Sequence, residues 1–146
     1  MGTGTEDGIV RVVAHFTDGR IIKGTTHDFA VEHPTFHLKV VGEPGPPVKV
    51  QLAALKAVFF VKTFEGKSER LDDKSFERAP NHGRRVRVRF KDGEEMAGIT
   101  VSFAPGRPGF FVIPADAGGN NVRVYVLRSA VKSLEWVNSP TPSLTR

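Results

Sequence analysis

The sequence predicts an all-β protein made of two small five-stranded β-barrels, and three observations lead to this prediction. Apolar and polar residues alternate along several segments with the period of two that marks half-buried strands. Asp-Gly pairs, which suit tight hairpin turns, directly follow two of these segments. Most of these features occur twice, at an offset of 74 residues, which indicates an internal repeat.

The repeat is carried by residues that set turns, bends and cores. Phe16-x-Asp18-Gly19 recurs as Phe90-x-Asp92-Gly93, and Pro34-x-Phe36 recurs as Pro108-x-Phe110. Val48-x-Val50 keeps the offset and matches Val122-x-Val124, and after two extra residues Leu55–Val61 matches Val131–Val137. Such agreement in Gly, Pro and Phe indicates duplication of one structural unit.

Each repeat contains five short strand-like segments. The first strand ends at the Asp-Gly turn, where Asp18 and Asp92 are expected to cap their own backbone beside Gly19 and Gly93. The second strand runs through Gly24 or Gly98, and a glycine inside a strand often marks the bend that a small barrel needs. The expected later strands contain Phe36–Leu38, Val48–Leu52 and Leu55–Val61 in the first repeat, and Phe110–Val112, Val122–Val126 and Val131–Val137 in the second.

The repeats divide the chain into five parts. We expect a flexible tail over residues 1–8, barrel repeat A over 9–63, a charged linker over 64–83, barrel repeat B over 84–137 and a second flexible tail over 138–146. Within the linker, Ser68 can N-cap a short helix that Pro80 would end. The alternative is a linker without a helix.

Composition excludes several classes of protein. The 146 residues hold no cysteine, which excludes disulfides, thiolate metal sites and cysteine catalysis. The first eight residues lack the pattern of a signal peptide, and no apolar run approaches the length of a membrane span. We therefore expect a cytoplasmic protein that has no contact with a membrane.

The repeat resembles the Sm and Sm-like proteins, the Hfq kind included. The shared motif is an alternating apolar strand, then Phe-x-Asp-Gly, four residues, Gly, and a Phe five residues later, which stands here as Val12–Phe29 and Val86–Phe103. The resemblance implies tandem Sm-like or SH3-like small barrels and permits RNA binding. The paired layout is also similar to an uncharacterised bacterial family of tandem repeats.

The known RNA pockets of Sm proteins do not carry over residue by residue. Those proteins have an Asn before the third strand and an Arg-Gly or Lys-His pair before the last. Repeat A has Glu32–Thr35 and Ala53-Ala54 in these places, and repeat B has Gly106–Gly109 and Arg128-Ser129. A weaker resemblance, to the Arg-x-x-x-Arg segment of cyclic di-guanylate-binding PilZ domains, rests on Arg85 and Arg89, but the companion Asp/Asn-x-Ser-x-x-Gly motif is missing.

A stripe of arginines is the strongest chemical candidate. Arg85, Arg87 and Arg89 should project from one face of a strand, and guanidinium groups suit phosphate through paired hydrogen bonds. The candidate phosphate or nucleic-acid site comprises Arg84, Arg85, Arg87, Arg89, Arg107 and Arg123, and Arg128 is a further residue that could add to it. The alternative is a solvated strand face paired with nearby acids.

Other polar residues give no catalytic or metal site. His15, His27, His33 and His37 lie in repeat A without a recognised zinc spacing, and their counterparts in repeat B are not histidines. No group of nucleophile, base and oxyanion donors can be assembled. We therefore expect no metal, no cofactor and no enzymatic activity.

Strands that are apolar on both faces must be covered on both faces. Residues 57–61 and 110–113 have this pattern, so Phe59, Phe111 and Ile113 should join the two barrels or a second subunit. The sequence thus predicts a non-enzymatic binding or adaptor protein that acts through protein–protein contacts or self-association. The alternative function is binding of nucleic acid or a cyclic dinucleotide by the basic face of repeat B.

Overall fold

The structure is a computed structural model that describes residues 9–64, 83–101, 103–104, 106–115 and 121–137. The strands are β1 (Val10–Phe16), β2 (Ile21–Thr26), β3 (Thr35–Val40), β4 (Val48–Gln51), β5 (Leu55–Val61), β6 (Arg84–Phe90), β7 (Glu95–Thr100), β8 (Gly109–Pro114), β9 (Asn121–Leu127) and β10 (Val131–Val137). Two single-turn 3-10 helices, η1 (Leu52–Ala54) and η2 (Arg128–Ala130), precede β5 and β10. The predicted all-β class is confirmed. The linker helix expected after Ser68 and both predicted tails lie outside the described residues.

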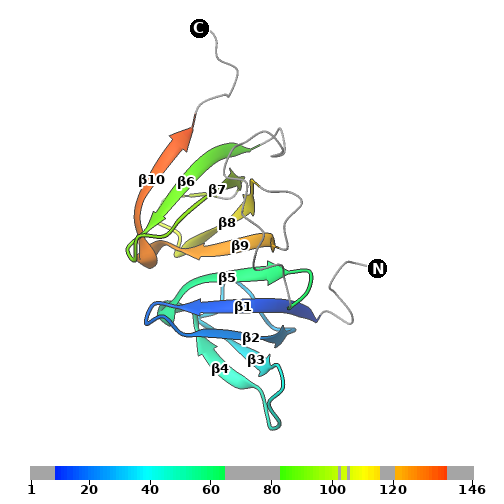
Figure 1. The fold of residues 1–146 in the computed structure, drawn as a ribbon. Helices are drawn as coiled ribbons and strands as arrows, with labels where there is room; N and C mark the ends of the chain where they lie inside the picture. The colour runs from blue at the N-terminus through cyan, green and yellow to red at the C-terminus, as the bar shows by residue number, and fades with distance from the viewer. Residues whose placement is uncertain (1–8, 65–82, 102, 105, 116–120, 138–146) are drawn as a thin grey trace, which may run out of the picture.

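The strands form one antiparallel sheet rather than two separate barrels. Its order is β10-β6-β7-β8-β9-β5-β1-β2-β3-β4 (Figure 1). We call β1–β5 half A and β6–β10 half B; each half has its fifth strand beside its first. The prediction of two closed barrels is not confirmed, because β5 is already paired with β1 and β9 and so cannot close onto β4. Among the described strands, β4 and β10 each pair on one side only.

The two halves repeat the same corner contacts between backbone groups. Leu52 N donates to Pro34 O at 2.9 Å, and Arg128 N donates to Pro108 O at the same distance. These contacts make Leu52 equivalent to Arg128. The sequence-based alignment of Val48-x-Val50 with Val122-x-Val124 is therefore wrong: Phe36 pairs with Val50 as Phe110 pairs with Val126, which places the two extra residues before this part of β9.

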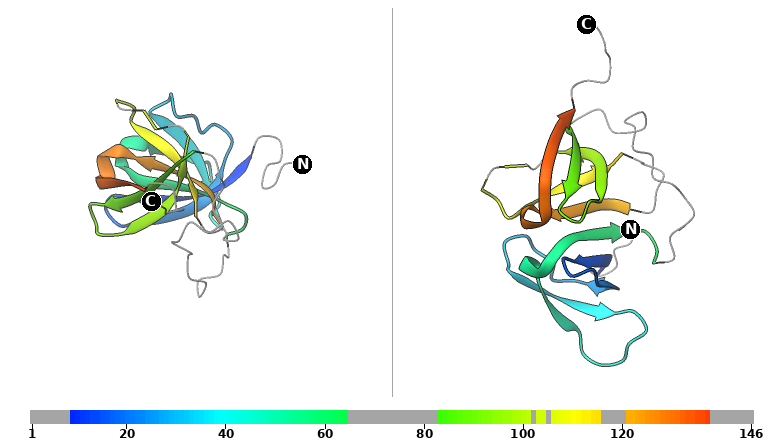
Figure 2. Two further views of the ribbon diagram at one scale, coloured as in Figure 1. Left: turned by 90° about the horizontal axis from the view of Figure 1, so that it is seen from above. Right: turned by 60° about the vertical axis from the view of Figure 1, so that its left-hand side comes forward.

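Two apolar cores lie on opposite sides of the joined strands β5 and β9. Core A is formed mainly by half A and core B mainly by half B. Figure 2 shows the two halves on either side of the boundary between β5 and β9. Val58 and Phe60 of β5 belong to core A, whereas Ala57 belongs to core B and Phe59 packs against it. In the same way Tyr125 and Leu127 of β9 belong to core A, and Val124 and Val126 to core B. The apolar character of both strand faces is thus explained by burial on both sides.

The two strand glycines, which the sequence assigns to bends, lie where a neighbouring strand comes very close. Gly24 and Gly98 are not among the glycines with positive φ. A Cβ atom at Gly24 would lie 2.5 Å from Lys39 O and 2.8 Å from Leu38 Cγ, and one at Gly98 would collide with Ile113 O and Val112. Both glycines therefore allow the neighbouring strand to approach closely.

The Asp-Gly turns link β1 to β2 and β6 to β7. Gly19 and Gly93 have φ of 97° and 96°, in the region that only glycine adopts freely. Asp18 Oδ1 accepts a hydrogen bond from Arg20 N at 3.0 Å, and Asp92 Oδ1 accepts one from Glu94 N at 2.9 Å. These contacts fix the shape of each turn. In the part of the chain that is described, no helix is long and apolar enough to cross a membrane.

Candidate functional site

The junction of the halves is fastened by a buried lysine. Lys56 lies on β5 with 7% of its surface exposed, and its Nζ donates to Asp92 at 2.8 Å and to Glu94, both in the turn of half B. The same Nζ lies 4.7 Å from the centre of the Phe90 ring. Burial disfavours the ammonium ion, but the hydrogen bonds to the two carboxylates outweigh burial and raise the pKa of Lys56. A charged lysine is therefore held between the halves.

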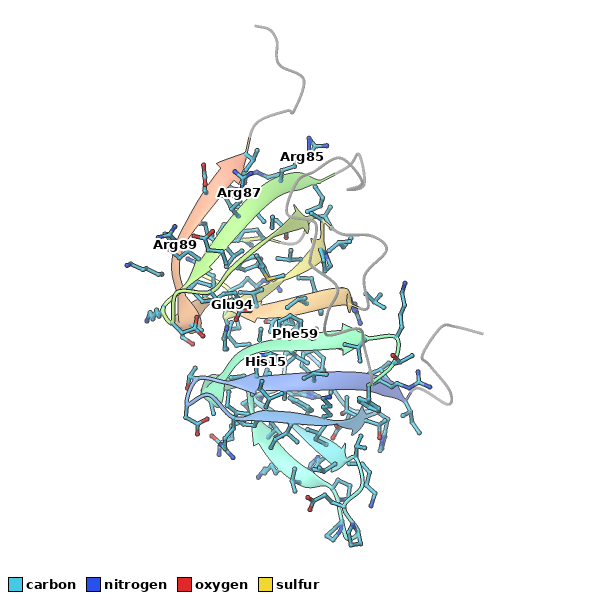
Figure 3. The ribbon with its side chains drawn as sticks, in the orientation of Figure 1. His15, Phe59, Arg85, Arg87, Arg89 and Glu94 are labelled. Atoms are coloured by element: carbon cyan, nitrogen blue, oxygen red, sulfur yellow. The ribbon has the colours of Figure 1, made fainter. Side chains whose placement is uncertain are left out.

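His15 and Phe59 lie beside this lysine. Their ring centres are 4.4 Å apart, and Figure 3 shows both residues and Glu94 gathered near the junction. Burial lowers the pKa of His15, although the charge of Glu94 opposes this change. This arrangement supports the junction and leaves His15 neutral at pH 7.

A cavity of about 610 Å³ opens between equivalent corners of the two halves. Half A contributes the loop before β3 and the segment entering η1, and half B contributes Pro108 and the segment entering η2. Its lining residues are Val31, Glu32, His33, Pro34, Gln51, Leu52, Ala53, Pro108, Leu127, Arg128 and Ser129. The size falls within the usual range for small-ligand sites, roughly 300–1,000 Å³.

Arg128 is the cation that lines this cavity. Its Nη1 is buried and has no hydrogen-bond partner among the described residues. Its guanidinium carbon lies 5.0 Å from the centre of the Phe103 ring. A buried donor without an acceptor is rare and calls for an explanation, because its lost hydration is not replaced.

The charges around the cavity entrance are mixed. Glu32 and His33 line the cavity beside Pro34, and in the described structure neither side chain makes a hydrogen bond or an ion pair. Burial raises the pKa of Tyr125, the positive charge of Arg107 opposes this, and the charge of Glu32 reinforces it. The cavity can therefore offer both donors and acceptors to a ligand.

The predicted arginine site does not form one patch. Arg85, Arg87 and Arg89 are spread along β6, away from the junction (Figure 3). Arg84 alternates to the other face, where its guanidinium lies 3.7 Å from the centre of the Trp136 ring. Arg123 lies against the rings of Phe60 and Phe111, with its guanidinium carbon 4.5 and 4.6 Å from their centres, and burial lowers its pKa.

Acidic residues occupy part of the arginine stripe. Arg89 forms an ion pair with Glu95, and Arg87 Nη1 lies 4.0 Å from Glu135 Oε1. Arg85 is half-buried and also has partners of its own. The positive charge that the stripe offers to a phosphate chain is thus smaller than the sequence predicts.

All three predicted interface residues are half-buried, and Phe59 and Phe111 lie where the halves meet. Phe59 pairs with Val124 across the joined strands, and Phe111 lies with its ring 4.9 Å from that of Tyr125 and packs against core A. Ile113 pairs with Ile99 within half B. The equivalent of Phe59 on the edge strand β10 is Glu135, and the equivalent of Phe111 on β3 is His37; both are exposed.

The histidines of half A are dispersed. His37 Nδ1 lies 2.8 Å from Asp28 Oδ2, His15 packs on Phe59, and His33 lines the cavity. Asp28 also accepts hydrogen bonds from His37 N and Thr26 Oγ1. Burial disfavours its carboxylate, but these bonds lower its pKa to about 2. The described residues contain no group of three or more His, Cys, Asp or Glu side chains placed to hold a metal ion.

Lys56 was absent from the predicted site, and Arg128 was expected only as an addition to the arginine stripe rather than at a cavity between the halves. Lys56 is a lone cation within the apolar strand Leu55–Val61, and Arg128 replaces the Leu that half A has at the same corner. Both are visible as exceptions to a local pattern, but only the pairing of β5 with β9 explains what they contact.

The fold and the cavity define an open all-β sheet protein with a small-ligand-sized cavity between two halves. The chain belongs to a family of unknown function, DUF6982, whose model matches residues 9–138 and so spans both halves. No curated protein and no solved structure matches the chain.

Proposed function

We propose that this chain is a non-enzymatic binding protein and that its ligand site is the cavity between the halves. The observation that carries the proposal is the open cavity of about 610 Å³, which lies between equivalent corners of the two halves. The loop residues that line it are fixed by the paired hydrogen bonds to Pro34 and Pro108. A cavity on a rigid frame needs little rearrangement to accept a ligand, which favours binding.

The polar side chains that line the cavity are not linked to one another by hydrogen bonds, and this favours binding over catalysis. Glu32, His33 and Ser129 line the cavity, yet no hydrogen bond connects these side chains in the described structure. A nucleophile, its base and a group that orients the base would normally form such a chain. The residues at hand are better suited to orient a ligand than to transform it.

The test adds a panel of small organic molecules to the protein and follows its amide signals by two-dimensional NMR. A variant whose cavity is filled by a tryptophan side chain is measured in the same way. We expect members of the panel to shift the amide signals of Val31, Leu52 and Leu127, and Ala53→Trp to abolish these shifts. Ala54→Trp is the matched control, because Ala54 lies on η1 outside the lining. The proposal fails when no molecule shifts these signals, or when both tryptophan variants behave like the unmodified protein.

Association at the sheet edges is the second candidate function. Among the described strands β4 and β10 have one unpaired side each, and an added strand from a partner or a second copy could pair there. The edges carry charges such as Lys49 and Glu135, which disfavour indiscriminate pairing. Native mass spectrometry over a range of concentrations tests this candidate, and a monomer at every concentration would exclude self-association.

Nucleic-acid binding by half B is supported less well. The pairing of Arg89 with Glu95 and the proximity of Arg87 to Glu135 reduce the charge available for phosphates. Any such binding should weaken steeply with salt, since it would depend on counterion release. A titration with single-stranded RNA and a cyclic dinucleotide at two salt concentrations checks this alternative.

A further inference from the structure

We infer that the cavity between the halves binds an organic anion, with a carboxylate or phosphate group held by Arg128 and an apolar body held by the surrounding side chains. This inference rests on the proposed function and adds the chemical class of the ligand. It follows from three features of the cavity: an unsatisfied cation, an apolar wall and a matching corner that lacks the cation.

The first of these three features is the cation, Arg128. Arg128 lines the cavity, its Nη1 is buried without an acceptor, and no carboxylate of the described residues pairs with it. The face of the Phe103 ring offers the guanidinium a weak cation–π contact but accepts no strong hydrogen bond. Nη1 itself is shielded from the cavity, but Nε and Nη2 of the same guanidinium are not buried and have no hydrogen-bond partner among the described residues. A carboxylate or phosphate oxygen in the cavity would accept hydrogen bonds from this group, and a guanidinium binds both kinds of anion through paired hydrogen bonds.

The apolar side chains that line the cavity indicate that the ligand has an apolar body in addition to its anionic group. Six of the lining residues are apolar: Val31, Pro34, Leu52, Ala53, Pro108 and Leu127. An inorganic anion would leave this wall uncovered. A ligand with an aliphatic or flat apolar body would remove it from water, at roughly 25 cal/mol for each Å² of apolar surface.

Comparison with the equivalent corner of half A identifies Arg128 as the residue that would make the cavity specific for an anion. Leu52 occupies the place of Arg128, and its side chain is buried in core A. The two corners otherwise share backbone geometry, since each begins with a hydrogen bond to a proline carbonyl at 2.9 Å. Arg128 is therefore not required to form the corner, and Arg128→Leu should preserve the fold.

The experiment compares ligands that differ only in the head group. Octanoate and octyl phosphate provide the two anions, and octanol and octylamine provide a neutral and a cationic head on the same chain. Isothermal calorimetry at constant ionic strength is carried out on the unmodified protein, Arg128→Leu, Arg128→Lys and Arg87→Leu. Arg87→Leu is the matched control, because it removes the same charge at an exposed site on β6.

We expect the anions to bind more tightly than octanol and octylamine. Arg128→Leu should weaken anion binding about tenfold or more, Arg128→Lys should weaken it less, and Arg87→Leu should leave it unchanged. A preference for octanoate or for octyl phosphate distinguishes a carboxylate ligand from a phosphate ligand. If Arg128→Leu does not fold, the Lys variant and the head-group comparison still decide the question.

Three results would overturn the inference, and they lead to different conclusions. Octanol binding in the cavity as tightly as octanoate, or anion binding that survives Arg128→Leu, would remove the role of Arg128 but keep the cavity as a ligand site. Failure of every probe in this series and in the wider panel to shift the cavity signals would reject the proposed function as well.

Discussion

Individual side chains in this protein have their roles set by contacts that are distant in sequence. Lys56 is separated by more than thirty residues from the carboxylates of Asp92 and Glu94, to which it donates hydrogen bonds. The sequence identifies Asp92 as a turn residue, which it is, but the bond to Lys56 depends on how the halves meet. Local chemistry was thus predictable here, and the interaction between halves was not.

Replacement of Lys56 tests how much this interaction stabilises the junction. Lys56→Met keeps the chain length of the side chain and removes its two charge-assisted hydrogen bonds, so it should lower the free energy of unfolding by about 1–3 kcal/mol. Lys132→Met is the matched control, because Lys132 is exposed at the equivalent position of β10. Urea titrations measure both variants, and an equal effect of the two would contradict a special role for Lys56.

Asp28 should make stability depend on acid pH. Its pKa in the folded protein is about 2, below the ordinary value of 3.8, so its contribution is complete above pH 4 and is lost as the pH falls from about 4 to about 2. Asp28→Asn should be less stable than the unmodified protein at pH 7, and the difference should shrink below pH 4. Thermal unfolding at a series of pH values gives the result; a constant difference would disprove the assignment.

At the scale of single strands, the pattern of apolar residues proved most informative. The sequence indicates that residues 57–61 and 110–113 must be covered on both faces, and β5 and β8 do lie at the boundary of the two cores. The sequence did not reveal the close approach at the strand glycines, because a glycine needed for a bend and one needed for close approach have the same sequence signal. The sequence also predicted the wrong register for β9, because two extra residues before the part that pairs with β8 shift the alignment.

Close approach at the strand glycines gives a direct test. Gly98→Ala would place its Cβ against Ile113 O and Val112, and we expect it to cost about 1–3 kcal/mol of stability, as overpacking typically does. Gly24→Ala should act in the same direction through Lys39 O and Leu38. Thermal melts that match the unmodified protein for both variants would show that the strands can separate without cost.

The whole molecule is organised by an asymmetry between its inner and outer strands. The positions of Ala57 and Phe59 on β5 are taken by Ser133 and Glu135 on β10. Apolar side chains thus lie where the halves meet, and polar side chains lie at the open edge. This contrast is present in the sequence, but it does not by itself say whether the apolar faces join the two halves or two chains; the pairing of β5 with β9 decides that they join the halves.

The shared strand predicts that the two halves unfold together. Because β5 contributes to both cores, Phe59→Glu would place a carboxylate against Val124 and core B and weaken the junction. It should lower stability by about 2–4 kcal/mol and shift a single transition of the whole chain.

The reciprocal substitution, on the edge strand β10, tests whether an apolar residue at this position stabilises the protein only at the junction. Glu135→Phe copies the residue of β5 onto β10, where it should change stability by less than about 0.5 kcal/mol, since the position is exposed. The added apolar surface should also increase association between chains, because it leaves β10 less protected. Differential scanning calorimetry and native mass spectrometry measure the two effects. Separate transitions for the two halves of the unmodified protein would show that β5 and β9 do not couple them.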